Sequence, residues 1–198
     1  SRKGVASYQV VFKGLTAHAG NNPQDGRNAN VAAMRFALAA YELANAERGT
    51  TVNPGVIQGG MGANIISDHC EVKFDLRFWN DEDGRDLAEK LLALTQRTWV
   101  EGVTQTAERL NYSPAMPLSD ATKELVEKIN DAAKEAGFDA RWVDAGGGSD
   151  GNHMAEMGLP VVDGCGPAGG GFHSEREFLR LDTVEERIHM IANLLKRL

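Results

Sequence analysis

The order of local sequence patterns in the first half of the chain is the feature that most restricts its fold. Four segments show the alternating apolar and β-branched side chains of strands, and two show apolar side chains at helical spacing. The order β-α-β-β-α-β predicts an α+β domain of ferredoxin-like type, a four-stranded antiparallel sheet with both helices on one face. The expected elements are Ala6–Lys13, the helix Asn28–Ala46, Thr51–Gln58, a strand within Ile65–Phe78, the helix Asp83–Val100 and Val103–Leu110.

The pattern changes at Tyr112–Leu118, where Pro114 and Pro117 interrupt any regular element. We therefore predict two domains, residues 1–113 and 114–198. Two short strands would leave little sheet for the later helices to cover, so we expect an incomplete α/β domain within a fragment of a longer chain. The elements expected there are helices at Ser119–Ala136 and Thr183–Leu198 and strands at Asp139–Val143 and Leu159–Val162.

Charge and composition exclude several classes of partner. The formal net charge of −7 and the pI of about 5.3 argue against nucleic acid, which needs a basic face. No apolar run approaches the ~18 residues of a membrane span, so we expect no membrane association. Cys70 and Cys165 are far apart and form neither a disulfide framework nor a zinc knuckle. The sequence does not define the cellular compartment, and the cytoplasm is slightly favoured over the periplasm.

Two glycine-rich loops carry most of the candidate chemistry of the second domain. Glycine loses much backbone entropy on folding, so such runs are typical of places where the backbone approaches a ligand. Gly146–Asp150 is either a tight turn or a row of N–H groups suited to a carboxylate or oxyanion. After the loop Gly166–Gly171, His173 is either bonded to a glycine carbonyl or a metal ligand, supported by Glu175 or Glu177.

The first domain offers three further candidates. His18 lies between two alanines in a loop, where its imidazole is either solvated or free to reach a ligand. Arg77 lies in an otherwise apolar strand, so it requires a carboxylate neighbour such as Asp75 or an anionic ligand. Asn64 is either a turn residue or a ligand-binding residue, and we regard His153 as a surface residue.

Taken together and in order, these motifs resemble the zinc-dependent aminoacylase/carboxypeptidase family of metallopeptidases. That family includes glutamate carboxypeptidase, succinyl-diaminopimelate desuccinylase, aminoacylase and peptidase T. The resemblance implies that residues 1–113 are a lid or dimerisation domain, and that 114–198 are the C-terminal part of the catalytic domain. The motifs that carry it are Lys13-Gly14, Ala17-His18-Ala19-Gly20, Gly26-Arg27-Asn28-Ala29, Gly62-Ala63-Asn64-Ile65-Ile66, Asp75-Leu76-Arg77, Gly146–Asp150 and Gly170-Gly171-Phe172-His173-Ser174.

The same resemblance implies a role for each candidate. His173 is implied as a zinc ligand, and His18 as the catalytic residue that stabilises the oxyanion in the active site of a partner subunit. Asn64 and Arg77 are implied around the substrate carboxylate. The backbone of Gly147, Gly148 and Ser149 is implied as a cradle for the substrate.

The implied enzyme is a homodimer that pairs through the lid and binds two zinc ions. It hydrolyses an amide or peptide bond next to a free carboxylate, in a small N-acyl amino acid or peptide. The family's remaining zinc ligands and its general base do not occur in this sequence, so we expect this chain alone to be inactive. Ser113-Pro114 stands where glutamate-releasing members carry Arg-Pro, so glutamate specificity is not implied. The alternative is a non-catalytic dimerisation or binding module derived from that fold.

Overall fold

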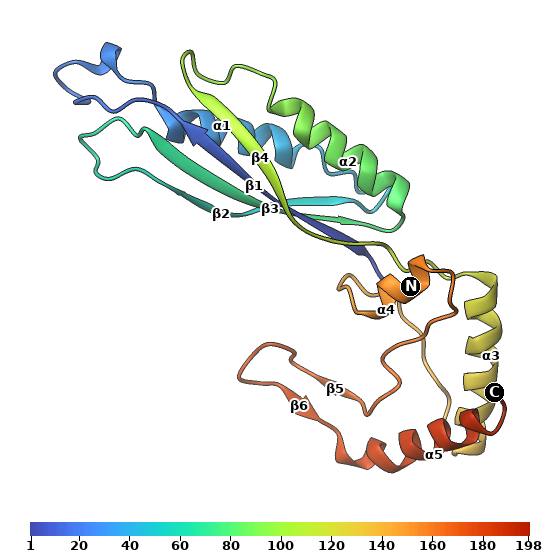
Figure 1. Cartoon of the computed structure of the whole chain (residues 1–198). Helices are drawn as coiled ribbons and strands as arrows, with labels where there is room; N and C mark the ends of the chain where they lie inside the picture. The colour runs from blue at the N-terminus through green and yellow to red at the C-terminus, as the bar shows by residue number, and fades with distance from the viewer.

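A computed structural model describes all 198 residues, and its first half is a sheet covered by two helices (Figure 1). The strands follow the order β2-β3-β1-β4, and all neighbours are antiparallel. Both helices lie on the same face of this sheet, so the predicted ferredoxin-like arrangement is confirmed. The elements are β1 (Gly4–Lys13), α1 (Ala29–Tyr41), β2 (Thr51–Gly59), β3 (His69–Phe78), α2 (Asp81–Leu94) and β4 (Thr104–Ser113), with a short 3-10 turn at Pro23–Asp25.

The core of this domain is centred on Phe36 of α1. Its ring centroid lies 5.4 Å from that of Phe12, 5.7 Å from that of Phe74 and 5.8 Å from that of Trp99. The helix approaches the sheet closely because small side chains occupy its inner face. The alanines buried on that face are Ala29, Ala32, Ala33, Ala37 and Ala40.

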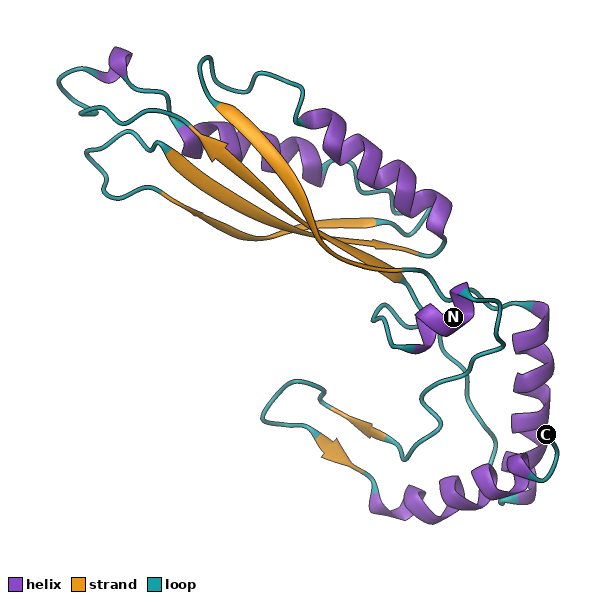
Figure 2. Cartoon of the chain, in the orientation of Figure 1, coloured by secondary structure: helices purple, strands orange, loops and turns teal.

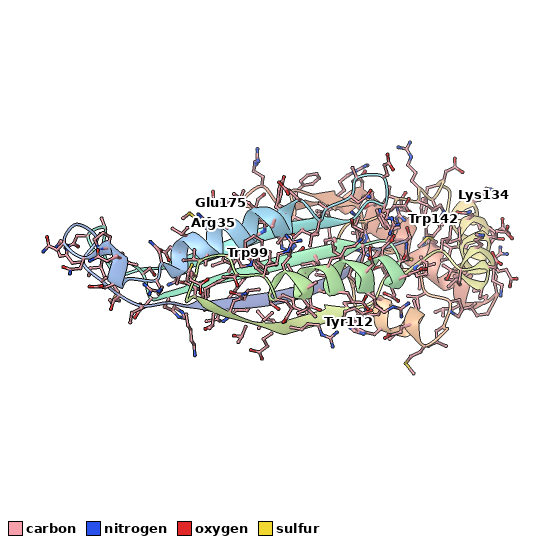
Figure 3. The ribbon with its side chains drawn as sticks, turned by 90° about the horizontal axis from the view of Figure 1, so that it is seen from above. Arg35, Trp99, Tyr112, Lys134, Trp142 and Glu175 are labelled. Carbon is pink, nitrogen blue, oxygen red and sulfur yellow. The ribbon has the colours of Figure 1, made fainter.

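Both helices begin within two residues of their predicted starts and end earlier than predicted. The side chain of Asn28 accepts from Val31 N at the start of α1, as an N-cap does. The helix predicted to reach Val100 ends at Leu94, because Trp99 folds back and its indole N–H donates to Leu94 O at 3.1 Å. Arg35 of α1 also donates to Trp99 O at 2.7 Å, and these two residues are labelled in Figure 3.

The second half contains more loop than regular structure (Figure 2). Its longest helices, α3 and α5, pack against each other through a small core that includes Ile129 and Met190. Gly137, with φ of +93°, follows the end of α3, as expected of a glycine that ends a helix. The elements are α3 (Asp120–Glu135), α4 (Gly151–Glu156), β5 (Gly169–Gly170), β6 (Phe178–Leu179), a 3-10 turn at Leu181–Thr183 and α5 (Val184–Leu195).

The strands predicted at Asp139–Val143 and Leu159–Val162 are wrong. Neither segment joins a sheet, and the strands observed in this half are the two-residue pair β5 and β6. A strand exists only through hydrogen bonds to a neighbour, and these segments have none within the chain. Val143 is 80% exposed and Leu159 is 54% exposed, so apolar side chains in both segments lie uncovered.

The first residues of the chain lie between segments of the second half. Arg2 and Met116 exchange backbone hydrogen bonds of 2.9 and 3.0 Å, and Lys3 N donates to Ala145 O at 3.0 Å. β4 ends at Ser113, immediately before the predicted boundary, which stays a prediction. None of the helices is long and apolar enough to cross a membrane.

Candidate functional site

Arg77 lies on the sheet face that α1 and α2 leave uncovered. Its neighbours Leu76 and Phe78 point into the core, so the alternation of β3 turns Arg77 outward. Its guanidinium makes two hydrogen bonds to Asp75, of 2.7 Å from Nε and 2.9 Å from Nη2. The carboxylate neighbour expected from the sequence is therefore Asp75. A longer bond of 3.4 Å runs from Nη1 to Gly146 O, which brings the first glycine-rich loop against the sheet.

A cleft lies where this loop meets the end of the sheet. The structure therefore brings together Arg77 and the predicted loop residues Gly147, Gly148 and Ser149. His153 also lines the cleft, although the sequence pattern indicated only a surface histidine. The full lining is Val5, Arg77, Asn111, Ser113, Gly147, Gly148, Ser149, Asp150 and His153.

Asn111 and Ser113 are cleft residues that the sequence patterns did not single out. Val5 pairs with Arg77 on one side and with Ser113 on the other, and directly opposed residues of antiparallel strands share a face. The signal that could have identified Ser113 is therefore the strand register. Register depends on pairing between distant segments, which periodicity alone does not give.

His18 and Asn64 lie next to each other at the opposite end of the sheet. Ala19 N donates to Asn64 O at 3.0 Å, and His18 forms an isolated antiparallel bridge with Ile65. The segment that joins β1 to α1 extends from the end of the sheet farthest from α4 (Figure 1). Both side chains are exposed there.

The imidazole of His18 is oriented by its own loop. Its Nδ1 accepts from Gly20 N and from Asn21 N, each at 3.1 Å. Two backbone donors on Nδ1 leave Nε2 to carry the proton of the neutral ring. An exposed Nε2–H is suited to donate a hydrogen bond to a carbonyl oxygen or oxyanion.

The two groups of candidate residues are too far apart to form one site within a chain. Val5 pairs with Arg77 and Lys13 is eight residue steps farther along β1. That separation is about 26 Å at the usual rise of a strand, and His18 lies beyond Lys13. One ligand of amino-acid size cannot contact both groups of the same chain.

His173 lies in the loop between β5 and β6, with φ of +62°. Its backbone N–H donates to Glu177 Oε2 at 3.2 Å, so Glu177 supports the loop. Among all 198 residues there is no group of three or more His, Cys, Asp or Glu side chains that could hold a metal ion. Zinc generally needs three or four protein ligands, so the residues present do not form a zinc site on their own.

Comparison with known proteins gives matches along nearly the whole chain. Carboxypeptidase G2 from Pseudomonas sp. (strain RS-16) is 28% identical over 97% of this chain and 47% of that protein. Succinyl-diaminopimelate desuccinylase from Thioalkalivibrio sulfidiphilus is 31% identical over 72% of this chain and 37% of that protein. The chain spans about half the length of the curated relatives that it matches from end to end.

Solved structures match the arrangement of the elements as well. The aminopeptidase PepT from Bacillus cereus superposes with a TM-score of 0.79 and 25% identity, over 98% of this chain and 52% of that chain. The family profile described as "Peptidase dimerisation domain" matches residues 1–103. The family resemblance drawn from the motifs is thereby confirmed. Because this profile covers more than half of the sequence, the chain belongs to the M20 peptidase family, and its first half is the dimerisation domain of that family.

Proposed function

We propose that this chain is the lid and the C-terminal catalytic part of a zinc-dependent hydrolase. Its reaction is the cleavage of an amide or peptide bond next to a free carboxylate, in a small N-acyl amino acid or peptide. One observation supports the proposal: in a chain of a peptidase family, an oriented imidazole and a cleft that contains Arg77 lie a sheet length apart. They act on one substrate only when two chains contribute.

In this arrangement His18 serves the active site of the partner subunit. Its Nε2–H donates to the scissile carbonyl, and the bond strengthens as negative charge develops on that oxygen. The two backbone bonds to Nδ1 hold the ring in this orientation before substrate binds. Asn64, which is paired with the same loop, belongs to the same contribution.

Arg77 and the loop Gly147–Ser149 bind the substrate of their own chain. Asp75 fixes the guanidinium plane through Nε and Nη2, which leaves Nη1 directed toward the glycine loop. A carboxylate between them would accept from Arg77 and from the N–H groups of Gly147 and Gly148, since Ser149 N already donates to Asn152 Oδ1. Among the residues that line the cleft, Arg77 is the one permanent cation and Asp150 is the one carboxylate.

Two zinc ions are part of the proposal, with His173 as one ligand. No group of three or more His, Cys, Asp or Glu side chains here could hold a metal ion. We expect the other ligands and the general base outside these 198 residues, and the chain alone to be inactive. Neighbouring strands for residues 139–143 and 159–162 would come from the part of the catalytic domain that supplies the other zinc ligands. Hydrolysis of an N-acyl amino acid by the enzyme that carries those ligands tests the proposal.

The surface proposed for dimerisation combines α1 with the edge strand β2. β2 is the outer strand of the sheet, so one side of its backbone has no partner strand. Val56 and Ile57 on β2 are 44% and 50% exposed, and α1 packs beside this strand. α1 presents Met34, Leu38 and Tyr41 to solvent, with Leu38 68% exposed. Two copies that meet here would pair strand with strand and helix with helix about a twofold axis.

Leu38→Glu is expected to convert the dimer into a monomer. A carboxylate buried without a partner costs several kcal/mol, so the dissociation constant should rise by at least about 100-fold. Sedimentation equilibrium measures this directly. The matched control is Leu92→Glu, because Leu92 is 40% exposed on α2, the other helix of the same layer. A Leu38→Glu protein that stays dimeric, or equal dissociation of both variants, would contradict this surface.

The alternative is a dimerisation or binding module without catalysis. The lack of a metal-ligand group within the 198 residues fits this alternative and the hydrolase equally. The two possibilities differ in the expected role of His18. A binding module needs no imidazole at this position for any turnover, whereas the hydrolase loses most of its rate without it.

A further inference from the structure

We propose that Asn152 is a positioning residue that holds the two walls of the cleft in register. Its side chain is 0% exposed, although α4 is a short helix on a loop-rich part of the chain. The amide Nδ2 donates to Pro114 O at 2.7 Å and to Lys3 O at 3.2 Å. Its Oδ1 accepts from Ser149 N at 3.0 Å. Both N–H groups and the carbonyl are therefore engaged.

The two carbonyl acceptors lie where the chain passes between its halves. Lys3 immediately precedes β1, and Pro114 immediately follows β4. These are the two points at which the backbone enters and leaves the sheet domain. One buried side chain thus binds both connections, and a buried amide with every group satisfied tolerates little displacement of its partners.

The third bond extends this contact to the glycine loop. Ser149 N is held by Asn152, and Ser149 Oγ accepts from Gly151 N at 3.2 Å. The position of Gly148 is close to both connections, since a Cβ there would lie 3.9 Å from Lys3 O and from Ser113 Oγ. The loop is therefore placed by the same side chain that places the two connections.

The consequence is a fixed cleft geometry. One wall is formed by Val5, Arg77 and Ser113. Val5 lies two residues after Lys3, Ser113 immediately precedes Pro114, and Arg77 pairs with Val5 across the sheet. The other wall is the loop Gly147–Ser149. Asn152 is bonded to Ser149 in the loop and to Lys3 and Pro114, which lie next to the other wall, so it helps to set the separation between the Arg77 guanidinium and the loop. Any consequence for turnover rests on the proposed function, whereas the geometric role does not.

Hydrogen exchange on the 198-residue chain separates positioning from general packing. In Asn152→Leu, which keeps a similar volume and loses all three bonds, the Ser149 amide, which donates to Asn152 Oδ1, should exchange at least about tenfold faster. Core amides of β3 and of α3 should keep their rates within about twofold.

The matched control is Asn130→Leu. The Asn130 side chain makes one hydrogen bond, from Trp142 Nε1 at 2.8 Å, and none to Lys3 or Pro114. This variant should leave the exchange rate of the Ser149 amide unchanged. Faster exchange throughout both cores of Asn152→Leu, or an unchanged Ser149 amide, would overturn the proposal.

A measurement on the unaltered chain covers the case in which Asn152→Leu does not fold. The side-chain NH2 of Asn152 should exchange at least about tenfold more slowly than that of an exposed asparagine such as Asn64. Equal exchange of the two would overturn the proposal. In the enzyme that carries the remaining ligands, Asn152→Leu should raise KM with zinc content unchanged. If the unaltered enzyme hydrolyses nothing, the proposed function fails, and the exchange data still decide the role of Asn152.

Discussion

Replacing His18 by alanine should lower turnover about 100-fold or more in the enzyme that carries the remaining zinc ligands. The side chain removed is an Nε2–H donor, held by two backbone bonds of 3.1 Å to Nδ1. A donor aimed at a developing oxyanion contributes mainly in the transition state, so kcat should fall more than KM rises. Zinc content, measured by elemental analysis, should be unchanged because His18 is not proposed as a ligand.

His189→Ala is the control for this experiment. His189 is exposed on α5 and has no proposed role, so its replacement should leave kcat within about twofold. Loss of zinc in His18→Ala would show that the residue is a ligand. An unchanged kcat would remove His18 from the reaction and favour the binding module.

Phe36→Ala should lower the free energy of unfolding of the sheet domain by about 3–5 kcal/mol. The ring is fully buried and contacts three other aromatic rings, so its removal leaves a cavity between α1 and the sheet. Urea unfolding followed by circular dichroism measures the change. Phe172→Ala is the matched control, because Phe172 is 70% exposed and its loss should change stability by no more than about 0.5 kcal/mol. A loss below about 1 kcal/mol for Phe36→Ala would contradict the central place of this ring.

The first half of the fold was predictable because its sheet is covered by its own helices. Ala6, Tyr8, Val10 and Phe12 are buried at every second position of β1, and the covering face of α1 follows in the next segment. The periodicity of apolar residues in this half therefore predicts both layers, the sheet and the helices that cover it. The helix ends were less predictable, since Trp99 has the spacing of a helical residue but caps the helix from beyond its end.

The second half was predictable only in its helices. Capping by Ser119 and the glycine at 137 are local signals, and both define α3. The strands expected at 139–143 and 159–162 have the composition of strands but need a partner that this sequence does not contain. Strand propensity alone does not form a β-ladder, because a ladder needs hydrogen bonds to a neighbouring strand.

The sequence allowed single candidate residues of the site to be predicted, but not which of them lie together in the structure. Arg77 was singled out because a charge in an apolar strand requires a partner, and the structure supplies Asp75. The meeting of Arg77 with the glycine loop depends on how the two halves join. Asn152, which bonds both connections, has the sequence signature of an ordinary polar residue on a short helix.

Whether His18 serves the active site of a partner chain is decided by mixing two inactive variants of the ligand-complete enzyme. His18→Ala keeps its own His173, and His173→Ala supplies His18 to its partner. After dissociation and reassociation in equal amounts, half of the dimers are mixed and each has one complete site, so activity should return to about a quarter of the unaltered level. Activity that stays at the sum of the two separate variants would contradict the proposal that His18 acts across the dimer.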